Sequence, residues 1–187
     1  MLAVDWQNGN RTILTDARLT GLVLGLTLHT TQAQIYRALI EATAFGARRI
    51  LDRLGEYDVT VDKVINCGGI AEKDAMFMQI YADVLGRPMF ISGSAQTCAL
   101  GSAIMAAVVA GKDAGGYDTC EEAQAAICSY KDTAYTPIPE NQAAYQELYE
   151  LYCELHDSFG VKGVSFDHFA VMKKLLDISR RATGGAA

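Results

Sequence analysis

Proline, tryptophan and histidine are scarce in this chain of 187 residues, which has three prolines, one tryptophan and three histidines. No apolar run approaches the roughly 20 residues that a helix needs to cross a bilayer. The N-terminus, "MLAVDWQNGNR", lacks the basic and apolar regions of a signal peptide. The net charge of −6 leaves no basic cluster that would attract nucleic acid. These absences predict a cytoplasmic protein that binds neither membranes nor nucleic acid.

The cysteines lack the spacing of a metal site or of a redox motif. There are five of them, none in a C-x-x-C pair, at Cys67, Cys98, Cys120, Cys128 and Cys153. An odd number of scattered cysteines is typical of reduced thiols in a cytoplasmic protein, and we expect most of them to be buried. No two candidate ligands have the usual zinc spacing, so we predict no metal site in this chain.

The hydrophobic pattern alternates between helical and strand periods. Half of the residues are hydrophobic and a fifth are charged, which favours a globular domain. An amphipathic helix is predicted over 32–54, capped by Thr30 or Thr31, with Ile35, Leu39, Ala42, Gly46 and Ile50 on its apolar face. Two short strands, "VDKVINC" and "MFIS", are separated by a helix near 74–85 that Asp74 can cap. This alternation predicts an α/β layer structure with parallel strands.

Helices dominate the rest of the chain. The stretch "CALGSAIMAAVVAG" is almost wholly apolar, so we expect a buried, tightly packed helix there. Short helices are predicted near 120–130 and 166–181. Between them, aromatic and leucine residues recur every three to four positions and predict an amphipathic helix over 140–159 that packs on the main body, through Tyr145, Leu148, Tyr149, Tyr152, Leu155 and Phe159.

The pair Gly68–Gly69 stands between a predicted strand and a predicted helix. Unpaired backbone N–H groups at such a point can hold a phosphate or an adjacent sugar and base, and a Cβ atom would keep the ligand away. Lys73 could add a cation at the same place. The stretch matches neither G-x-x-x-x-G-K-[ST] nor G-x-G-x-x-G. Spacing alone therefore leaves two readings open, a structural tight turn and a nucleotide site.

Three stretches resemble a known family in the order in which that family has them. The run "NCGGIAEKDAMFMQIYADVLGRPMFISGSAQTCALGSAIMAAVVAG" resembles the adenosine-binding segment of the FGGY carbohydrate kinases, and within them the L-ribulokinases. "LAVDWQNGNRT" and "LIEATAFGARRILD" are similar to the stretches that precede it. The resemblance runs from residue 1 to about 112, and the tail matches only in being helical. We therefore expect a nucleotide-binding portion of the C-terminal kinase domain at 1–112 and a helical extension packed on it at 113–187.

The resemblance implies part of an actin-like, ribonuclease-H-like ATPase domain. In such kinases ATP lies mainly on the C-terminal domain and the sugar mainly on the N-terminal one. By the family's pattern Gly69 and Lys73 contact the nucleotide, although relatives often have Asn at the position of Lys73. Local geometry adds four neighbours of the adenosine, namely Gly68, Ile70, Asp74 and Phe77.

The resemblance further implies an ATP-dependent phosphorylation of L-ribulose at its terminal hydroxyl, a step of arabinose catabolism. Mg²⁺ would be held mainly by phosphates and by residues outside this chain. The base that accepts the hydroxyl proton belongs to the family's N-terminal domain, so no catalytic residue is assigned here. We expect this chain to be a C-terminal fragment, inactive alone, that meets the sugar through the missing domain. A homodimer is left open.

Several alternatives stay open at this stage. Asn8 and Arg11 either line the cleft between the two kinase domains, as the family's loop does, or form a surface turn. The substrate of the parent enzyme could instead be xylulose, rhamnulose or glycerol, because sugar choice lies mainly in the missing domain. A non-catalytic nucleotide-binding module is the alternative from another functional class.

Overall fold

The computed structural model describes residues 1–182 and 184, which divide into two compact units. The first unit comprises residues 1–62, 80–87 and 137 onward, and the second comprises 63–79 and 88–136. The chain thus passes from the first unit to the second and back twice. The boundary predicted at residue 112 does not fall between the two units, since residues 113–136 belong to the second unit.

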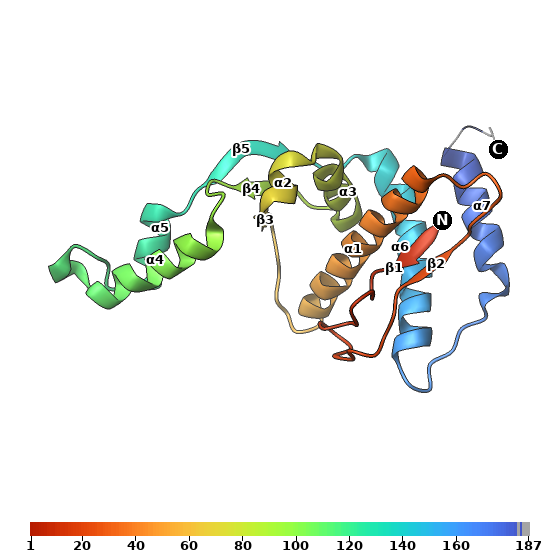
Figure 1. Ribbon diagram of the computed structural model, residues 1–187, viewed down its shortest axis with the longest axis horizontal. Coiled ribbons are helices and arrows are strands. Elements are labelled where there is room, and N and C mark those ends of the chain that lie inside the picture. The colour runs from red at the N-terminus through yellow and green to blue at the C-terminus, as the bar shows by residue number, and fades with distance from the viewer. Residues whose placement is uncertain (183, 185–187) are drawn as a thin grey trace. The chain divides into compact units, whose positions relative to one another are not determined.

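The first unit is built on a long helix and a two-stranded hairpin. Strands β1 (Leu2–Val4) and β2 (Leu22–Leu24) pair antiparallel, with Ala3 opposite Val23. Helices α1 (Gln32–Gly55) and α6 (Pro139–Gly160) pack on β1 and on each other, and α7 (Val171–Ala182) lies along α6. Figure 1 shows these elements side by side, with α1 in orange and α6 and α7 in blue.

The helix predicted over 32–54 and its threonine cap are confirmed by α1. Two neighbouring elements cover this helix, so more than its predicted apolar face is buried. Thr31 accepts a hydrogen bond from the Gln34 backbone N–H at 3.3 Å, and the Gln34 side chain accepts one from the Thr31 N–H. Of the predicted face only Ala42 is fully buried; Ile35, Leu39, Gly46 and Ile50 are half-buried. Because α1 contacts both β1 and α6, burial spreads to Ala38, Ile40, Ala44 and Phe45.

Helix α6 docks through the predicted stripe, and each of its three tyrosine hydroxyls reaches a carboxylate. Tyr145, Tyr149, Tyr152 and Leu155 are buried, whereas Leu148 is half-buried and Phe159 at the helix end is 57% exposed. Tyr145 donates to Glu41 at 3.0 Å, Tyr149 donates to Asp52, and Tyr152 donates to Asp5 at 3.2 Å. Burial raises the pKa of all three tyrosines, so the hydroxyls stay protonated and act as donors.

The second unit holds a three-stranded sheet in the order β3-β4-β5. Strand β3 (Val64–Asn66) pairs parallel with β4 (Met89–Ser92), as predicted. Strand β5 (Tyr130–Tyr135) pairs antiparallel with β4 and was not predicted from the sequence. Its alternation of polar and apolar residues is weak, and only its pairing with β4 makes it a strand.

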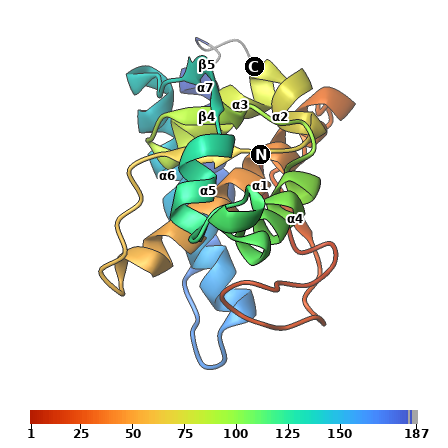
Figure 2. The same ribbon diagram turned by 90° about the vertical axis from the view of Figure 1, so that its left-hand side faces the viewer.

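Four helices complete the second unit or enter it. They are α2 (Gly69–Lys73), α3 (Ala75–Leu85), whose first half belongs to this unit, α4 (Thr97–Ala110) and α5 (Cys120–Ile127). Figure 2 shows α4 and α5 packed against each other. Within the described residues, 3₁₀ turns are formed by Lys112–Ala114 in this unit and by His168–Ala170 in the first unit.

Two expectations about burial are wrong. Ile104 is the only fully buried residue of α4, while Met105 and Val109 are 53% and 88% exposed. The helix makes its main contacts with α5 and the turn after α4, and much of its apolar surface stays outside these contacts. Among the cysteines, Cys67, Cys98 and Cys128 are exposed and the other two are half-buried.

No helix formed by residues 1–182 and 184 is both long enough and apolar enough to cross a membrane.

Candidate functional site

The glycine pair follows strand β3 after one residue, Cys67, as predicted. Gly68 has φ of +94°, a conformation that L side chains rarely adopt, so the turn itself requires glycine there. Gly69 begins α2 and has an ordinary φ. A Cβ atom at Gly69 would meet no atom of the described chain within 4 Å. Neither conformation nor packing within the part of the chain that the structure describes therefore explains glycine at position 69.

The segment after the glycines forms two helices rather than the one predicted. Helix α2 is a single turn that ends when the Asp74 backbone N–H donates to the Ile70 carbonyl at 2.9 Å. Asp74 then accepts a hydrogen bond from the Phe77 N–H at 2.9 Å, which confirms it as the cap of α3. Its carboxylate is thus directed to the start of α3.

The six residues predicted around the nucleotide lie along this short segment. Gly68, Gly69, Ile70 and Lys73 are exposed, whereas Asp74 and Phe77 are half-buried. Ile70 is 62% exposed, which leaves an apolar side chain beside the glycines. The first backbone N–H groups of α2 have no intrahelical partner, as in every helix. The arrangement offers hydrogen-bond donors next to an apolar surface.

Acidic groups near the glycines already have partners. Glu72 accepts from Lys131 at 3.2 Å, and Asp74 caps α3. Within the part of the chain that the structure describes, no group of three or more His, Cys, Asp or Glu side chains could hold a metal ion. The chemistry available at this segment is binding of a ligand rather than proton transfer.

Asn8 and Arg11 lie in the first unit, where they line a cleft of about 420 Å³. The walls also include Asp5, Trp6 and neighbours on the same loop, the α1 residues Thr43, Gly46, Ala47 and Ile50, and Tyr81 of α3. The predicted Asn8–Gly9 turn is present: Gly9 has φ of +75° and its N–H donates to the Trp6 carbonyl at 3.1 Å. The loop thus forms this turn and one wall of a cleft within the first unit, while its place at the cleft between the two kinase domains stays a prediction.

Asp5 is the charged group inside this cleft, and sequence reasoning missed it. A Cβ atom at Gly46 would lie 2.9 Å from an Asp5 carboxylate oxygen, so glycine lets the carboxylate approach α1. Burial raises the pKa of Asp5 above its usual range, although the Tyr152 hydroxyl and His156 oppose this. The feature of the sequence that could have identified Asp5 is its position directly before Trp6 in "DWQNGNR".

His156 lies behind the same loop as a packing residue. It is 1% exposed, and its ring meets the Trp6 ring edge-to-face with centroids 5.3 Å apart. Burial lowers the pKa of His156, which keeps the ring neutral near pH 7, and its Nδ1 lies 2.8 Å from Asp157.

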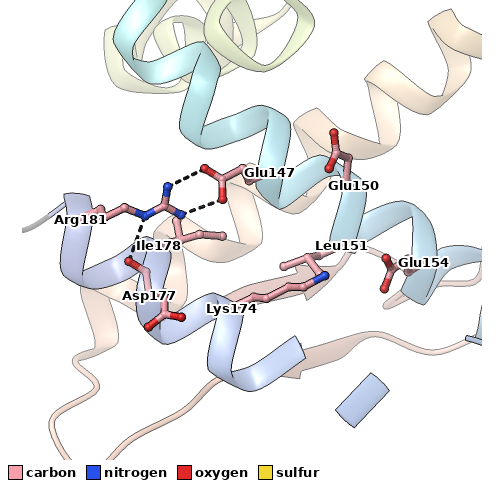
Figure 3. Close-up of a pocket in the computed structure, with 8 residues that line it drawn as sticks. All are labelled: Glu147, Glu150, Leu151, Glu154, Lys174, Asp177, Ile178 and Arg181. Carbon is pink, nitrogen blue, oxygen red and sulfur yellow. Dashed lines mark hydrogen bonds and ion pairs between the residues drawn. The ribbon is translucent and has the colours of Figure 1, made fainter. Parts of the chain in front are cut away.

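A second cavity, of about 300 Å³, lies between α6 and α7. Figure 3 shows its walls, where Arg181 makes two hydrogen bonds to Glu147 at 2.9 and 2.7 Å. Leu151 and Ile178 form its apolar side, and the rest of the wall is charged. The ion pair between Arg181 and Glu147 joins α7 to α6. We therefore assign this cavity to the packing of the two helices.

Comparison with known proteins places the chain in a family. The C-terminal domain of the FGGY family of carbohydrate kinases matches residues 1–110. The ribulokinase of Geobacillus thermodenitrificans is 50% identical over 160 residues, which are 86% of this chain and 28% of that protein. The ribulokinase of Shouchella clausii is 46% identical over 186 residues, covering 100% of this chain and 32% of that protein. The similarity therefore continues beyond residue 112, where the tail was expected to match only in being helical.

Solved structures show the same fold. The xylulose kinase of Lactobacillus acidophilus matches with a TM-score of 0.73 at 23% identity, over 86% of this chain and 31% of that one. The xylulose kinase of Rhodospirillum rubrum matches with a TM-score of 0.67 at 25% identity, over 84% of this chain and 30% of that one. These are sugar kinases with the actin-like ATPase fold, so the predicted fold class is confirmed.

The chain spans about 28–32% of the length of these two ribulokinases. The family match covers 110 consecutive residues, including both the cleft loop and the glycine pair. The chain belongs to the FGGY family of carbohydrate kinases, and residues 1–110 are part of that family's C-terminal domain.

Proposed function

We propose that this chain is the ATP-binding C-terminal portion of an L-ribulokinase. The parent enzyme would transfer the γ-phosphoryl group of Mg-ATP to the terminal hydroxyl of L-ribulose, in the cytoplasm. Support comes from relatives named ribulokinase at 46–50% identity over 86% or more of this chain. The division into a nucleotide-binding part at 1–112 and an extension at 113–187 is retained only as part of this proposal.

One observation carries the assignment of the nucleotide to the glycine pair. Gly69 needs glycine neither for its backbone conformation nor for packing, because a Cβ atom there would meet only open space. Gly55 is equally open, and Gly69 differs from it in standing where strand β3 leads into helix α2; a ligand that approaches the backbone at this junction would account for the glycine.

In this proposal Gly68 and Gly69 present backbone N–H groups to the nucleotide, and Lys73 adds a solvent-screened cation. The half-buried Phe77 and the exposed Ile70 offer apolar contacts to the adenine, and Asp74 fixes the start of α3 beside it. Mg²⁺ would be held mainly by phosphate oxygens and by carboxylates outside this chain.

The chemical step breaks the bond between the γ-phosphorus and ADP and forms a bond to the sugar oxygen, while the hydroxyl proton passes to a base. Glu72 is paired with Lys131 and Asp74 caps a helix, so neither is assigned as that base. We place the base in the portion that precedes this chain in the longer relatives. This chain's part is to bind and orient the nucleotide.

Gly69→Val should weaken ATP binding by about thirtyfold, or roughly 2 kcal/mol, because the branched side chain occupies the space in front of the backbone. The fold should persist, since no described atom lies within 4 Å of the new Cβ. Isothermal titration calorimetry with ATP measures the change. Gly55→Val is the matched control, because position 55 is equally open. Equal affinities of the Gly69→Val variant and the wild type would refute the nucleotide assignment.

The isolated chain should give no sugar-dependent release of ADP in a coupled assay. Adding the N-terminal two thirds of the Geobacillus thermodenitrificans ribulokinase as a separate polypeptide should produce turnover, with L-ribulose preferred to xylulose and glycerol. The Gly69→Val variant should fail in the same mixture. Turnover by the chain alone that Gly69→Val abolishes would show that it carries its own base, contrary to the proposal.

A further inference from the structure

An ion pair joins strand β5 to helix α2 beside the proposed nucleotide site. Lys131 Nζ lies 3.2 Å from Glu72 Oε1, although the two residues are 59 positions apart in the chain. Both belong to the second unit, as does Gly69. We propose that Lys131 is a positioning residue for ATP, which neutralises Glu72 so that the phosphates can approach the backbone at Gly69. This inference rests on the proposed function and assigns the charge balance of the same site.

Helix geometry places Glu72 next to the open space at Gly69. Residues three apart in a helix lie on the same face, and helical side chains tilt toward the N-terminus. Helix α2 begins at Gly69, so the Glu72 side chain is directed toward the turn that contains this glycine. The space in front of Gly69 is open, because a Cβ atom there would meet no described atom within 4 Å. A carboxylate beside this space repels a phosphate unless a cation offsets its charge.

The other charged groups of this segment do not offset Glu72. Asp74 is half-buried and accepts a hydrogen bond from the Phe77 N–H at 2.9 Å, which directs its carboxylate to the start of α3. Lys73 is exposed and stands four residues after Gly69, so it faces the same opening. Without Lys131, the charge of Glu72 would oppose the attraction of Lys73 for phosphate. With Lys131 in place, that attraction is retained.

The stability of the fold gives little reason for this ion pair. The side chains of Lys131 and Glu72 are 44% and 25% exposed. Pairs with such exposure contribute little to folding, because solvent screens their charges. A bound nucleotide displaces part of this water and brings negative charge of its own. The sign of the local charge therefore matters more for binding than for folding.

Calorimetric titration with ATP tests the role of Lys131 in four proteins: the wild type, Lys131→Met, Glu72→Gln and the double variant. Lys131→Met keeps the length of the side chain and removes its charge, so ATP should bind about fivefold more weakly at about 0.1 M salt. Glu72→Gln should bind ATP at least as tightly as the wild type. The double variant should regain the wild-type affinity to within about twofold, because no carboxylate is left to neutralise.

The double variant separates this role from simple bracing of α2. It lacks the ion pair, so bracing alone would leave it as weak as Lys131→Met. Lys131→Arg keeps the charge and should bind ATP like the wild type. The deficit of Lys131→Met should shrink as salt rises from about 0.1 M to about 1 M, since the Debye length falls from about 10 Å to about 3 Å. Circular dichroism melts establish that each variant is folded.

Lys63→Met is the matched control, because it removes an equal charge from the other face of the sheet. Lys63 Nζ lies 4.8 Å from the centroid of the Tyr130 ring. Tyr130 and Lys131 are neighbours in β5, so their side chains point to opposite faces. Lys63 also precedes β3, whereas the glycine pair follows that strand. Lys63→Met should therefore leave the affinity for ATP unchanged.

The inference is overturned if Lys131→Met binds ATP as tightly as the wild type. It is also overturned if the double variant stays as weak as Lys131→Met, which would mean that Lys131 does not act through Glu72. In both cases a Gly69→Val variant that binds more weakly than the wild type leaves the nucleotide function standing. Equal binding by Gly69→Val and the wild type, or no binding by either, refutes the proposed function and this inference with it.

Discussion

Replacing Phe45 by alanine should lower the free energy of unfolding by about 3–5 kcal/mol, the usual cost of removing a buried aromatic ring. Phe45 is 1% exposed in the middle of α1. Its ring centroid lies 6.1, 6.1 and 5.5 Å from those of Tyr145, Tyr149 and Tyr152. The cavity left by alanine would therefore open at the centre of the contact between α1 and α6, where three large rings cannot easily close it.

Urea unfolding followed by circular dichroism measures this loss. Tyr36→Ala is the control, because it truncates an aromatic ring on the same helix that is 60% exposed, and it should cost less than about 1 kcal/mol. Similar losses for the two variants would mean that α6 does not stabilise α1 through this contact.

The tyrosine stripe of α6 shows what the periodicity of a sequence can predict and what it cannot. A repeat of three to four residues predicted which side of α6 would be buried, because burial follows from helix geometry alone. It could not predict the carboxylate partners of the hydroxyls, since Tyr152 and Asp5 are 147 positions apart and Tyr149 and Asp52 are 97 apart. Contacts over such separations depend on the whole fold.

The errors of prediction have a common physical origin. The apolar composition of α4 predicted a buried helix, but burial depends on how many elements surround a helix, and α4 makes its main contacts with α5 and the following turn alone. The short strand β5 has little pattern of its own and exists through pairing with β4. In both cases the neighbours, rather than the local sequence, decide the outcome.

The candidate site was partly predictable for the same reason. The turn at Gly68 and the cap at Asp74 are local features, and both are present. The cleft around Asn8 and Arg11 also contains Asp5, Thr43 and Tyr81, which come from three segments of the chain. Their assembly follows from the packing of β1, α1 and α3, so no local motif could have indicated it.

Replacing Asp83 by alanine should lower the free energy of unfolding by about 3 kcal/mol, because it removes the acceptor at the start of α6. Asp83 is 3% exposed in α3 and accepts hydrogen bonds from the Ile138 backbone N–H and the Asn141 side-chain amide, both at 2.7 Å. The N-cap residue of α6 is Ile138, whose side chain cannot accept a hydrogen bond. A carboxylate from another helix thus serves as the cap.

Three comparisons separate this role from a general effect of mutation. Asp83→Asn keeps one acceptor oxygen and should lose about half as much stability as Asp83→Ala. Asp62→Ala, at an exposed position of the same unit, should change stability by less than about 0.5 kcal/mol. The Ile138 amide should exchange its hydrogen markedly faster in Asp83→Ala, since the acceptor of that N–H is gone. A loss below about 1 kcal/mol with unchanged exchange at Ile138 would mean that water replaces the carboxylate at no cost, and that α6 does not depend on α3 for its N-terminal cap.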